Sequence, residues 1–188
     1  MSNKVKYNLK NVHYAVIQTE GTADAWPTYD TPVPWPGAVS LSMEQQGSIS
    51  KFRADGITYW QAAQNNGYEG DLTMALILDQ FRVDCLGEEL NTDKVYLEKV
   101  KAEGKGFALL FEFDGDEKEI KHVLYNCTAT RPNIEGKTSE EEVEPDTEAL
   151  TISAVSLPNG YVKARTGAET TESARANWYK SVYTPAGK

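Results

Sequence analysis

The sequence predicts a mainly β domain with one short helix and two long excursions from its strands. Runs rich in β-branched and aromatic residues recur along the chain and end at Gly, Asn or Asp turn signals. A single segment places apolar residues at helical spacing, and two polar segments interrupt the strand-like runs. The length of 188 residues suits one domain, 1–188.

The first half of the chain supplies three predicted strands. Residues 12–19 are β-branched and aromatic, and residues 38–43 alternate apolar with small polar side chains. Residues 68–78 predict a buried strand. Between the first two lies a Pro/Trp-rich segment, 22–36, with four prolines. Because proline has no amide donor for a ladder, we expect this segment to be a loop or an extended arm.

A second excursion, 44–66, is predicted to be an extended loop or hairpin arm. Two dipeptides within or at its end favour tight hairpin turns, Asp55-Gly56 and Asn66-Gly67. The segment also holds three large rings with little else to build a core, namely Phe52, Tyr59 and Trp60. Long excursions of this kind are more often functional than idle.

One helix is predicted to begin near Asp79. Leu78, Phe81 and Cys85 fall at three- and four-residue spacing, and Gly87 is placed to end the helix. Asp79 is expected to be the N-cap. With only two to three turns, about the minimum for a helix, it must pack on another element to be stable.

The second half returns to strands. Residues 107–113 and 120–127 predict a hairpin, and residues 95–100 and 150–155 predict two further strands. Several strands are apolar on both faces, which predicts a sheet covered on both sides, by its own domain or by a neighbour. The polar segment 163–188 predicts a C-terminal arm that docks on a surface or forms a short helix.

The charge balance excludes one class of function. With 28 acidic and 19 basic residues the formal net charge is −9, whereas gripping duplex DNA needs clustered Lys and Arg. The acidic run from 140 to 146 is expected to be a solvated loop or a surface that repels nucleic acid. No signal peptide or membrane span is apparent, so we expect a soluble chain made in the cytoplasm, with Cys85 and Cys127 reduced.

No catalytic constellation is apparent. His13 and His122 lie in strand-like runs, and both cysteines are expected to be buried apolar residues. Gly104-Lys105-Gly106 lacks the rest of a phosphate-loop pattern. With 28 acids some pair lies at glycosidase distance in any fold, so composition nominates no acid/base couple. We therefore predict no enzyme activity and no catalytic, cofactor or metal site.

Excess loops that bear Trp and Tyr point to self-association. The residues predicted to lie at such a subunit interface are Trp26, Trp35, Phe52, Tyr59, Trp60 and Trp178. The alternative is a monomeric β-sandwich that binds carbohydrate, because aromatic faces suit sugars. Its platform would consist of three rings, Trp26, Trp35 and Trp60.

Six motifs, in order along the chain, resemble those of a known family. They are Gly37-Ala38-Val39 before a strand, Phe52-x-Ala54-Asp55, Asn66-Gly67-Tyr68-Glu69-Gly70-Asp71-Leu72, Phe81-x-x-Asp84-x-Leu86-Gly87, Phe107-Ala108-Leu109-Leu110-Phe111-Glu112 and Tyr125-Asn126-Cys127-x-x-x-Arg131-Pro132. From about Asn11 to Val155 the chain resembles the major tail (tail tube) proteins of long-tailed phages and prophages of Gram-positive bacteria.

This resemblance implies the tail-tube fold, two packed antiparallel sheets with one short flanking helix and long loop arms. It implies a structural virion protein whose six-membered rings self-assemble into a tube with an acidic channel for DNA. The segments 22–36 and 44–66 would bridge stacked rings. The implied partners are further copies and the tail tip, tape measure and terminator proteins. The implied locations are the virion tail and, during assembly, the host cytoplasm.

Overall fold

The computed structural model describes residues 3–138 and 145–185. Strands account for 46% of the described residues and helices for 8%, so the predicted mainly β class is confirmed. Neither helix of the described residues is long and apolar enough to cross a membrane.

Nine strands form the main sheet, and every pairing in it is antiparallel. The order is β2-β1-β10-β11-β12-β7-β4, with β3 also pairing with β1 and β13 with β11. The bounds are β1 (Lys6–Thr19), β2 (Thr28–Tyr29), β3 (Val33–Pro34), β4 (Ala38–Gln46), β7 (Gly67–Met74), β10 (Phe107–Gly115), β11 (Ile120–Ala129), β12 (Glu148–Ala154) and β13 (Lys163–Arg165).

Two hairpins and two helices complete the described structure. The hairpins pair β5 (Ile49–Ala54) with β6 (Ile57–Ala63) and β8 (Glu89–Leu90) with β9 (Tyr96–Leu97). The helices are α1 (Asp79–Leu86) and α2 (Glu172–Asn177). The strand predicted over 95–100 is therefore reduced to β9, since only this part finds a partner strand.

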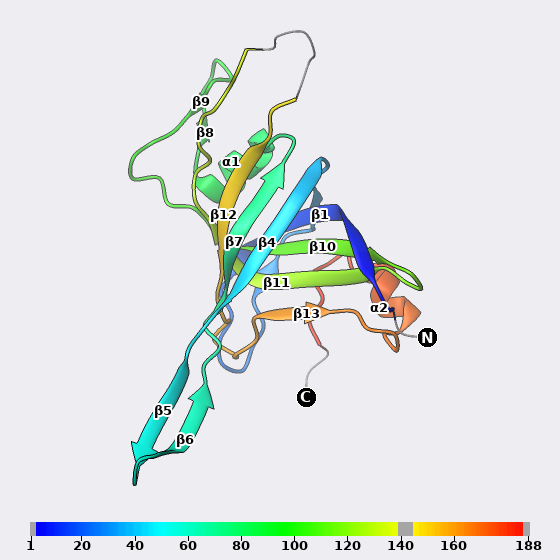
Figure 1. The fold of residues 1–188 in the computed structure, drawn as a ribbon. Helices are drawn as coiled ribbons and strands as arrows, with labels where there is room; N and C mark the ends of the chain where they lie inside the picture. The colour runs from blue at the N-terminus through cyan, green and yellow to red at the C-terminus, as the bar shows by residue number, and fades with distance from the viewer. Residues whose placement is uncertain (1–2, 139–144, 186–188) are drawn as a thin grey trace.

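The main sheet folds over so that two layers pack face to face. β4, β7 and β12 form one layer and cross β1, β10 and β11 at a large angle (Figure 1). β1 and β4 also contact each other, so the sheet nearly closes on itself. The two packed layers are thus parts of one hydrogen-bonded sheet. Fully buried side chains from both layers fill the space between them, among them Leu72, Met74, Leu109, Leu150 and Ile152.

Helix α1 is stable because it packs on the rings of this core. The Phe81 side chain is fully buried, and its ring centroid lies 5.1, 4.5 and 5.2 Å from those of Tyr14, Trp35 and Phe107. The Tyr14 hydroxyl donates to Asp84 Oδ2 on the same helix at 3.0 Å. Packing of one helical face therefore stabilises a helix too short to persist alone.

The ends of α1 agree only partly with the sequence. Gly87 ends the helix with φ of 78°, as predicted. The predicted N-cap is wrong: the N-cap is Leu78, which has no side-chain cap hydrogen bond, and Asp79 is the first helical residue. A tertiary contact holds this end instead, because Arg82 on the helix pairs with Glu148 of β12 at 3.0 Å.

The other face of β1, β10 and β11 is covered by the chain's own C-terminal segment. Trp178 is 2% exposed, and Leu157 and Val182 are also buried. They pack on the outward side chains of the sheet, which are Ala15, Ala108, Leu110, Val123 and Tyr125. The strands apolar on both faces are therefore covered within one chain, and the covering segment contains α2.

The Pro/Trp-rich segment 22–36, predicted to be a loop or an extended arm, is a loop that lies against the body and contains β2 and β3. It folds back on β1, where Pro34 lies opposite His13. Trp35 is 1% exposed, and its Nε1 donates to the Leu76 carbonyl at 3.0 Å. Pairing of β3 with β1 places Pro34 at the sheet edge, where a missing amide donor is tolerated.

Candidate functional site

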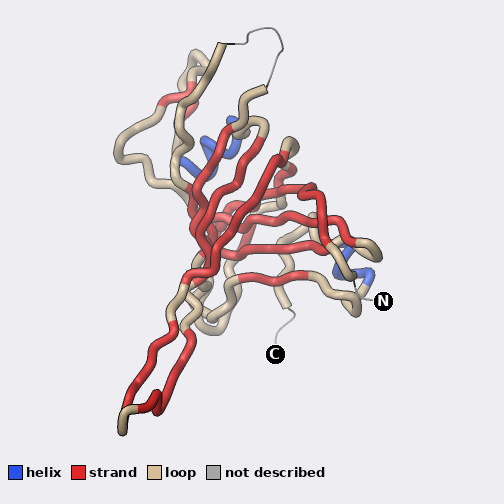
Figure 2. The backbone as a smooth tube through the Cα atoms, viewed as in Figure 1, coloured by secondary structure: helices blue, strands red, loops and turns tan. Residues whose placement is uncertain are grey.

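The hairpin β5–β6 projects from the body as a continuation of the β4–β7 ribbon (Figure 2). We call residues 48–64 the arm. At its base Gln46 pairs with Gly67, and the Gln64 amide donates to the Ser48 carbonyl at 2.9 Å. At its tip Asp55 and Gly56 both have positive φ, 52° and 77°, so this predicted tight turn is confirmed.

The second predicted tight turn is wrong. Asn66 and Gly67 lie where the arm rejoins β7, not at a hairpin tip. Gly67 has φ of 104°, and a Cβ there would collide with the Ala154 carbonyl of β12. Glycine is therefore required for the close approach of two strands.

One face of the arm is apolar and aromatic. Phe52 pairs with Trp60 across the hairpin, and Ala54 pairs with Ile57. The register shifts between Phe52 and Arg53, which leaves Tyr59 without a partner and lets its ring lie 6.5 Å from that of Phe52. The exposed fractions are large, 59% for Phe52, 70% for Tyr59, 55% for Trp60 and 63% for Ile57.

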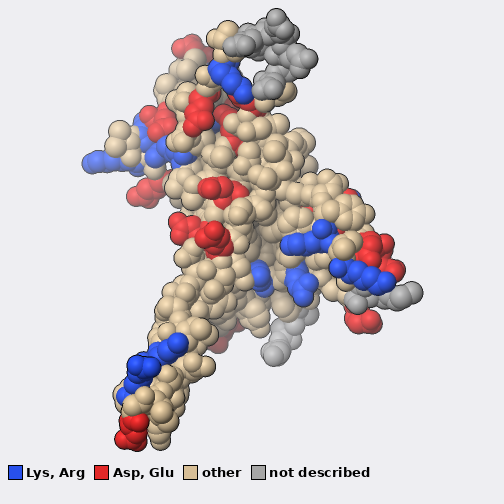
Figure 3. All heavy atoms as spheres, in the orientation of Figure 1, with Lys and Arg blue, Asp and Glu red and all other residues tan. Residues whose placement is uncertain are grey.

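The opposite face of the arm is basic. Lys51 and Arg53 alternate with Phe52 and Ala54 on β5 and are exposed, and Ile49 at the base of the arm lies on the same face as these two cations. The arm carries one acid, Asp55, at its tip. Figure 3 shows these basic side chains along the projecting hairpin. Among the described strands, β5 and β6 pair only with each other, and an isolated two-stranded hairpin is marginally stable in water. A projecting hairpin with an exposed aromatic face is therefore a candidate contact surface.

A second surface, which we call the acidic face, is the outer side of β4, β7 and β12. Glu44 lies directly opposite Glu69, and Asp71 accepts a hydrogen bond from Thr151 at 2.8 Å. The three acids are exposed and surround a shallow depression of about 360 Å³. Figure 3 shows acidic side chains over this layer. Like charges directly opposite each other destabilise a sheet, so their placement calls for a functional reason.

The structure separates the six residues predicted at a subunit interface. Phe52, Tyr59 and Trp60 gather on the arm. Trp35 and Trp178 lie in the two cores, which corrects the prediction, because buried rings are not available to a partner. Trp26 is partly buried, its ring 5.0 and 4.8 Å from two rings, those of Tyr125 and Tyr161.

Several residues of the two surfaces are not among those that the sequence predicts to lie at an interface. Lys51, Arg53 and Ile57 follow from alternation once the hairpin tip is fixed at Asp55-Gly56. Ser42 and Glu44 on β4 also alternate with apolar residues. The pairing of Glu44 with Glu69 depends on a register that no local pattern reveals. Of the acidic run at 140–146, residues 140–144 lie outside the described residues.

The histidines and cysteines have structural surroundings. His13 stacks on Tyr179 at 4.4 Å. Cys85 and Cys127 are buried, and burial raises the pKa of the Cys127 thiol to about 12, so it stays protonated at neutral pH. Within residues 3–138 and 145–185, no group of three or more His, Cys, Asp or Glu side chains is placed to hold a metal ion.

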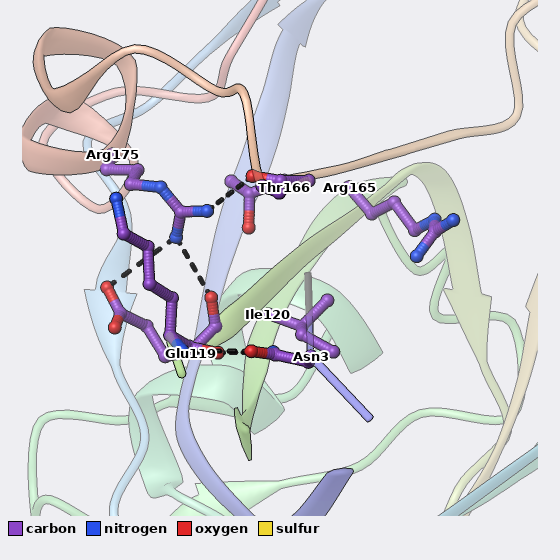
Figure 4. Close-up of a pocket in the computed structure, with 9 residues that line it drawn as sticks. Asn3, Glu119, Ile120, Arg165, Thr166 and Arg175 are labelled. Carbon is purple, nitrogen blue, oxygen red and sulfur yellow. Dashed lines mark hydrogen bonds and ion pairs between the residues drawn. The ribbon is translucent and has the colours of Figure 1, made fainter. Parts of the chain in front are cut away.

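The pocket in Figure 4 joins the C-terminal segment to β11. It encloses about 310 Å³ beside α2. Arg175 is 5% exposed and donates to the carbonyls of Glu119, at 2.9 Å, and Gly167. Arg165 points away from Arg175 (Figure 4), so the two guanidinium groups do not converge on a common anion. Through these two hydrogen bonds Arg175 anchors α2 to β11 and to the segment that precedes the helix.

We expect His122 to make the protein sensitive to acid. The pKa of His122 is lowered to about 4, mainly because the ring is buried beside the parallel Phe111 ring, 5.1 Å away. The positive charges of Lys6, Lys163 and Arg165 lower this pKa further. The unfolded chain takes up this proton near pH 6.5, so folding stability falls between pH 6.5 and 4, by about 2 kcal/mol at pH 5. Urea unfolding at pH 7 and pH 5 should show this loss in the wild type and not in His122→Gln. An equal loss in both proteins contradicts the assignment.

Comparison of the sequence with models of known protein families, and with curated protein sequences, gives no match.

Proposed function

We propose that the chain is a structural subunit of a phage tail tube, in which rings of six copies stack around an acidic channel that DNA passes through. The observation that carries the proposal is that one layer of the sheet bears both the acidic face and the arm. One layer leaves a polar, acidic outer face, and the same layer extends into an arm with exposed rings. In a hollow assembly the acidic face would line the channel and the arm would contact neighbouring subunits.

The acidic face suits a channel because it repels phosphate. Glu44, Glu69 and Asp71 lie on adjacent strands, and ring formation would repeat them in every copy. A continuous negative lining leaves DNA free to slide, since binding of nucleic acid depends on cations that replace its counterions. The need for a negative lining would explain why Glu44 and Glu69 lie opposite each other although their carboxylates repel.

The free edge of β4 supports ring closure. In the described residues β4 pairs with β7 on one side, and no strand pairs with its other edge. An unpaired edge is a template for another chain, and a closed ring removes it. The proposed further partners are the tail tip, tape measure and terminator proteins, in the virion tail and, during assembly, in the host cytoplasm.

The carbohydrate-binding alternative lacks a platform. Its three rings, Trp26, Trp35 and Trp60, lie respectively against Tyr125, in the core and on the arm. They do not share a surface, so no observation favours this function over assembly.

Negative-stain microscopy of the concentrated protein tests the proposal. It should show rings or tubes on the order of 80–100 Å across, from six domains of this mass. A protein that stays monomeric at every concentration and salt condition contradicts it.

Reversing the charge of the acidic face should convert the channel into a DNA-binding surface. We expect tubes of the triple variant Glu44→Lys, Glu69→Lys, Asp71→Lys, assembled with duplex DNA, to retain nuclease-resistant DNA that salt releases. Wild-type tubes should retain none. A matched variant changes three other exposed acids, Asp24→Lys, Asp93→Lys and Glu103→Lys. If the triple variant holds no more protected DNA than this control, the acidic face does not line the channel.

A further inference from the structure

Three exposed cations gather around His122, on β1 and β13. Arg165 lies directly opposite His122 across the β13–β11 pair, and Lys163 lies two residues away on the same face. Lys6 Nζ lies 4.6 Å from the centroid of the Phe113 ring, which is itself 5.6 Å from the His122 ring. We call Lys6, Lys163 and Arg165 the basic patch. Figure 3 shows basic side chains over this part of the sheet.

Among the described residues, no acid neutralises the basic patch. Its three members take part in none of the ion pairs that these residues form with one another. The acids of β10 alternate with its aromatic residues and so lie on the other face, where Glu112 accepts from the Tyr179 hydroxyl at 2.9 Å and Asp114 pairs with Lys10. A cluster of unpaired cations on a chain of net charge −9 favours contact with a negative partner.

The same chain carries a segment of opposite charge, residues 135–146, which we call the acidic segment. It holds six carboxylates and one ammonium group, Lys137, which pairs with Asp146 at 3.8 Å. Its described parts, 135–138 and 145–146, are exposed. Figure 1 shows them at the end of the molecule opposite the arm and away from β13. A contact between the basic patch and the acidic segment therefore joins two different copies.

The two surfaces lie on opposite sides of the layer that bears the acidic face. β4 forms one side of this layer and β12 the other, and the acidic segment leads almost directly into β12. On the β4 side, β10 and β11 extend past β4, with β13 alongside β11 (Figure 1). A ring that repeats the layer side by side brings the β12 side of one copy to the β4 side of the next. Such a contact joins two unlike surfaces and closes into a ring when the rotation between copies suits.

We propose that the basic patch receives the acidic segment of the neighbouring copy in the ring. This inference rests on the proposed function and names the pair of surfaces that holds adjacent copies side by side. It is separate from the arm, which contacts copies of the next ring. Complementary charges orient a docking partner and speed its association. One exposed ion pair contributes little, but several pairs repeated at each contact of a closed ring add their effects.

Nucleic acid is the competing occupant of a basic surface. Binding of duplex DNA needs cations spread along one face or helix, because each phosphate contact adds a small share of the affinity. The basic patch has three cations at one end of a sheet, and the net charge of −9 repels DNA at a distance. A short acidic segment matches the patch better than a duplex does.

Charge reversal on both surfaces tests the contact. The patch variant carries Lys6→Glu, Lys163→Glu and Arg165→Glu, and the segment variant carries Glu140→Lys, Glu141→Lys and Glu142→Lys. Either variant alone places like charges against each other at every contact, so the concentration needed for assembly should rise at least about tenfold. Mixed in equal amounts, the two should alternate around a six-membered ring with opposite charges at every contact, and assemble at the wild-type concentration. A chain with all six changes should assemble alone, which shows that the changes leave it folded.

Two matched variants are the controls. Lys94→Glu, Lys101→Glu and Lys105→Glu reverse three exposed cations elsewhere and should leave assembly unchanged. The triple lysine variant of the acidic face should not restore assembly of the patch variant.

The pairing is overturned, while the tube proposal stands, by any of three results. These are normal assembly of either reversed variant alone, a patch variant restored by the acidic-face variant and not by the segment variant, and a patch reversal that changes only binding of duplex DNA. A mixture of the two reversed variants that stays monomeric also overturns it. Restored oligomers that are neither rings nor tubes support the pairing and contradict the tube. If the wild type never self-associates, both proposals fail.

Discussion

Removal of the arm is expected to abolish assembly and leave a folded, monomeric domain. Gln46 and Gly67 are paired across the ribbon, so residues 47–66 can be replaced by a two-residue Asn-Gly turn without changing the register of β4 and β7. The arm contributes no residue to either core. The free energy of unfolding should therefore change by less than about 0.5 kcal/mol. Sedimentation and electron microscopy should show monomers at concentrations at which the wild type forms tubes.

A matched variant separates the rings from the backbone of the arm. Phe52→Ser, Tyr59→Ser and Trp60→Ser keep its length, its turn and its basic face but remove most of its exposed apolar surface. Since aromatic anchors dominate interface energies, we expect this variant, like the chain without the arm, to remain monomeric. Tubes that grow normally from the chain with the Asn-Gly turn contradict the assignment of the arm to stacking.

Local patterns in the sequence predict the strands well because two-residue alternation is a local signal. Phe107, Leu109 and Phe111 enter one core while Ala108 and Leu110 enter the other, and this is why the predicted strand has no polar face. The same logic predicted the arm, since the Asp-Gly turn fixes the hairpin whatever surrounds it.

Residues whose position depends on distant pairing could not be placed in this way. Trp35 and Trp178 were predicted at an interface because their neighbours are prolines or polar residues. Trp35 is buried because β3 pairs with β1, and Trp178 because the C-terminal segment packs against β10 and β11. Likewise, Glu44 and Glu69 are 25 residues apart in the sequence, and only the β4–β7 register brings them together. The sequence therefore predicts that an acidic surface exists but does not identify the residues that form it.

Trp35→Ala should lower the free energy of unfolding of the monomer far more than the same truncation on the arm, Trp60→Ala. Its side chain is 1% exposed, lies 4.5 Å from the Phe81 ring, and donates a hydrogen bond to the Leu76 carbonyl. Truncation leaves a cavity and an unpaired carbonyl, which lowers the free energy of unfolding by about 3–5 kcal/mol. That is a large share of the roughly 5–15 kcal/mol that stabilises a domain. Urea denaturation of the monomer measures the change.

Trp60→Ala is the matched control, because the same truncation is made on a ring that is 55% exposed. It should change the stability of the monomer by less than about 0.5 kcal/mol and yet weaken assembly. Trp35→Phe should recover most of the lost stability, since a ring still fills the site next to Phe81, and should miss only the contribution of the hydrogen bond, about 1 kcal/mol. Equal destabilisation by Trp35→Ala and Trp60→Ala contradicts the division of the aromatic residues into core rings and assembly rings. The opposite pattern, in which Trp35→Ala blocks assembly with monomer stability unchanged, would restore Trp35 to the interface at which the sequence predicts it.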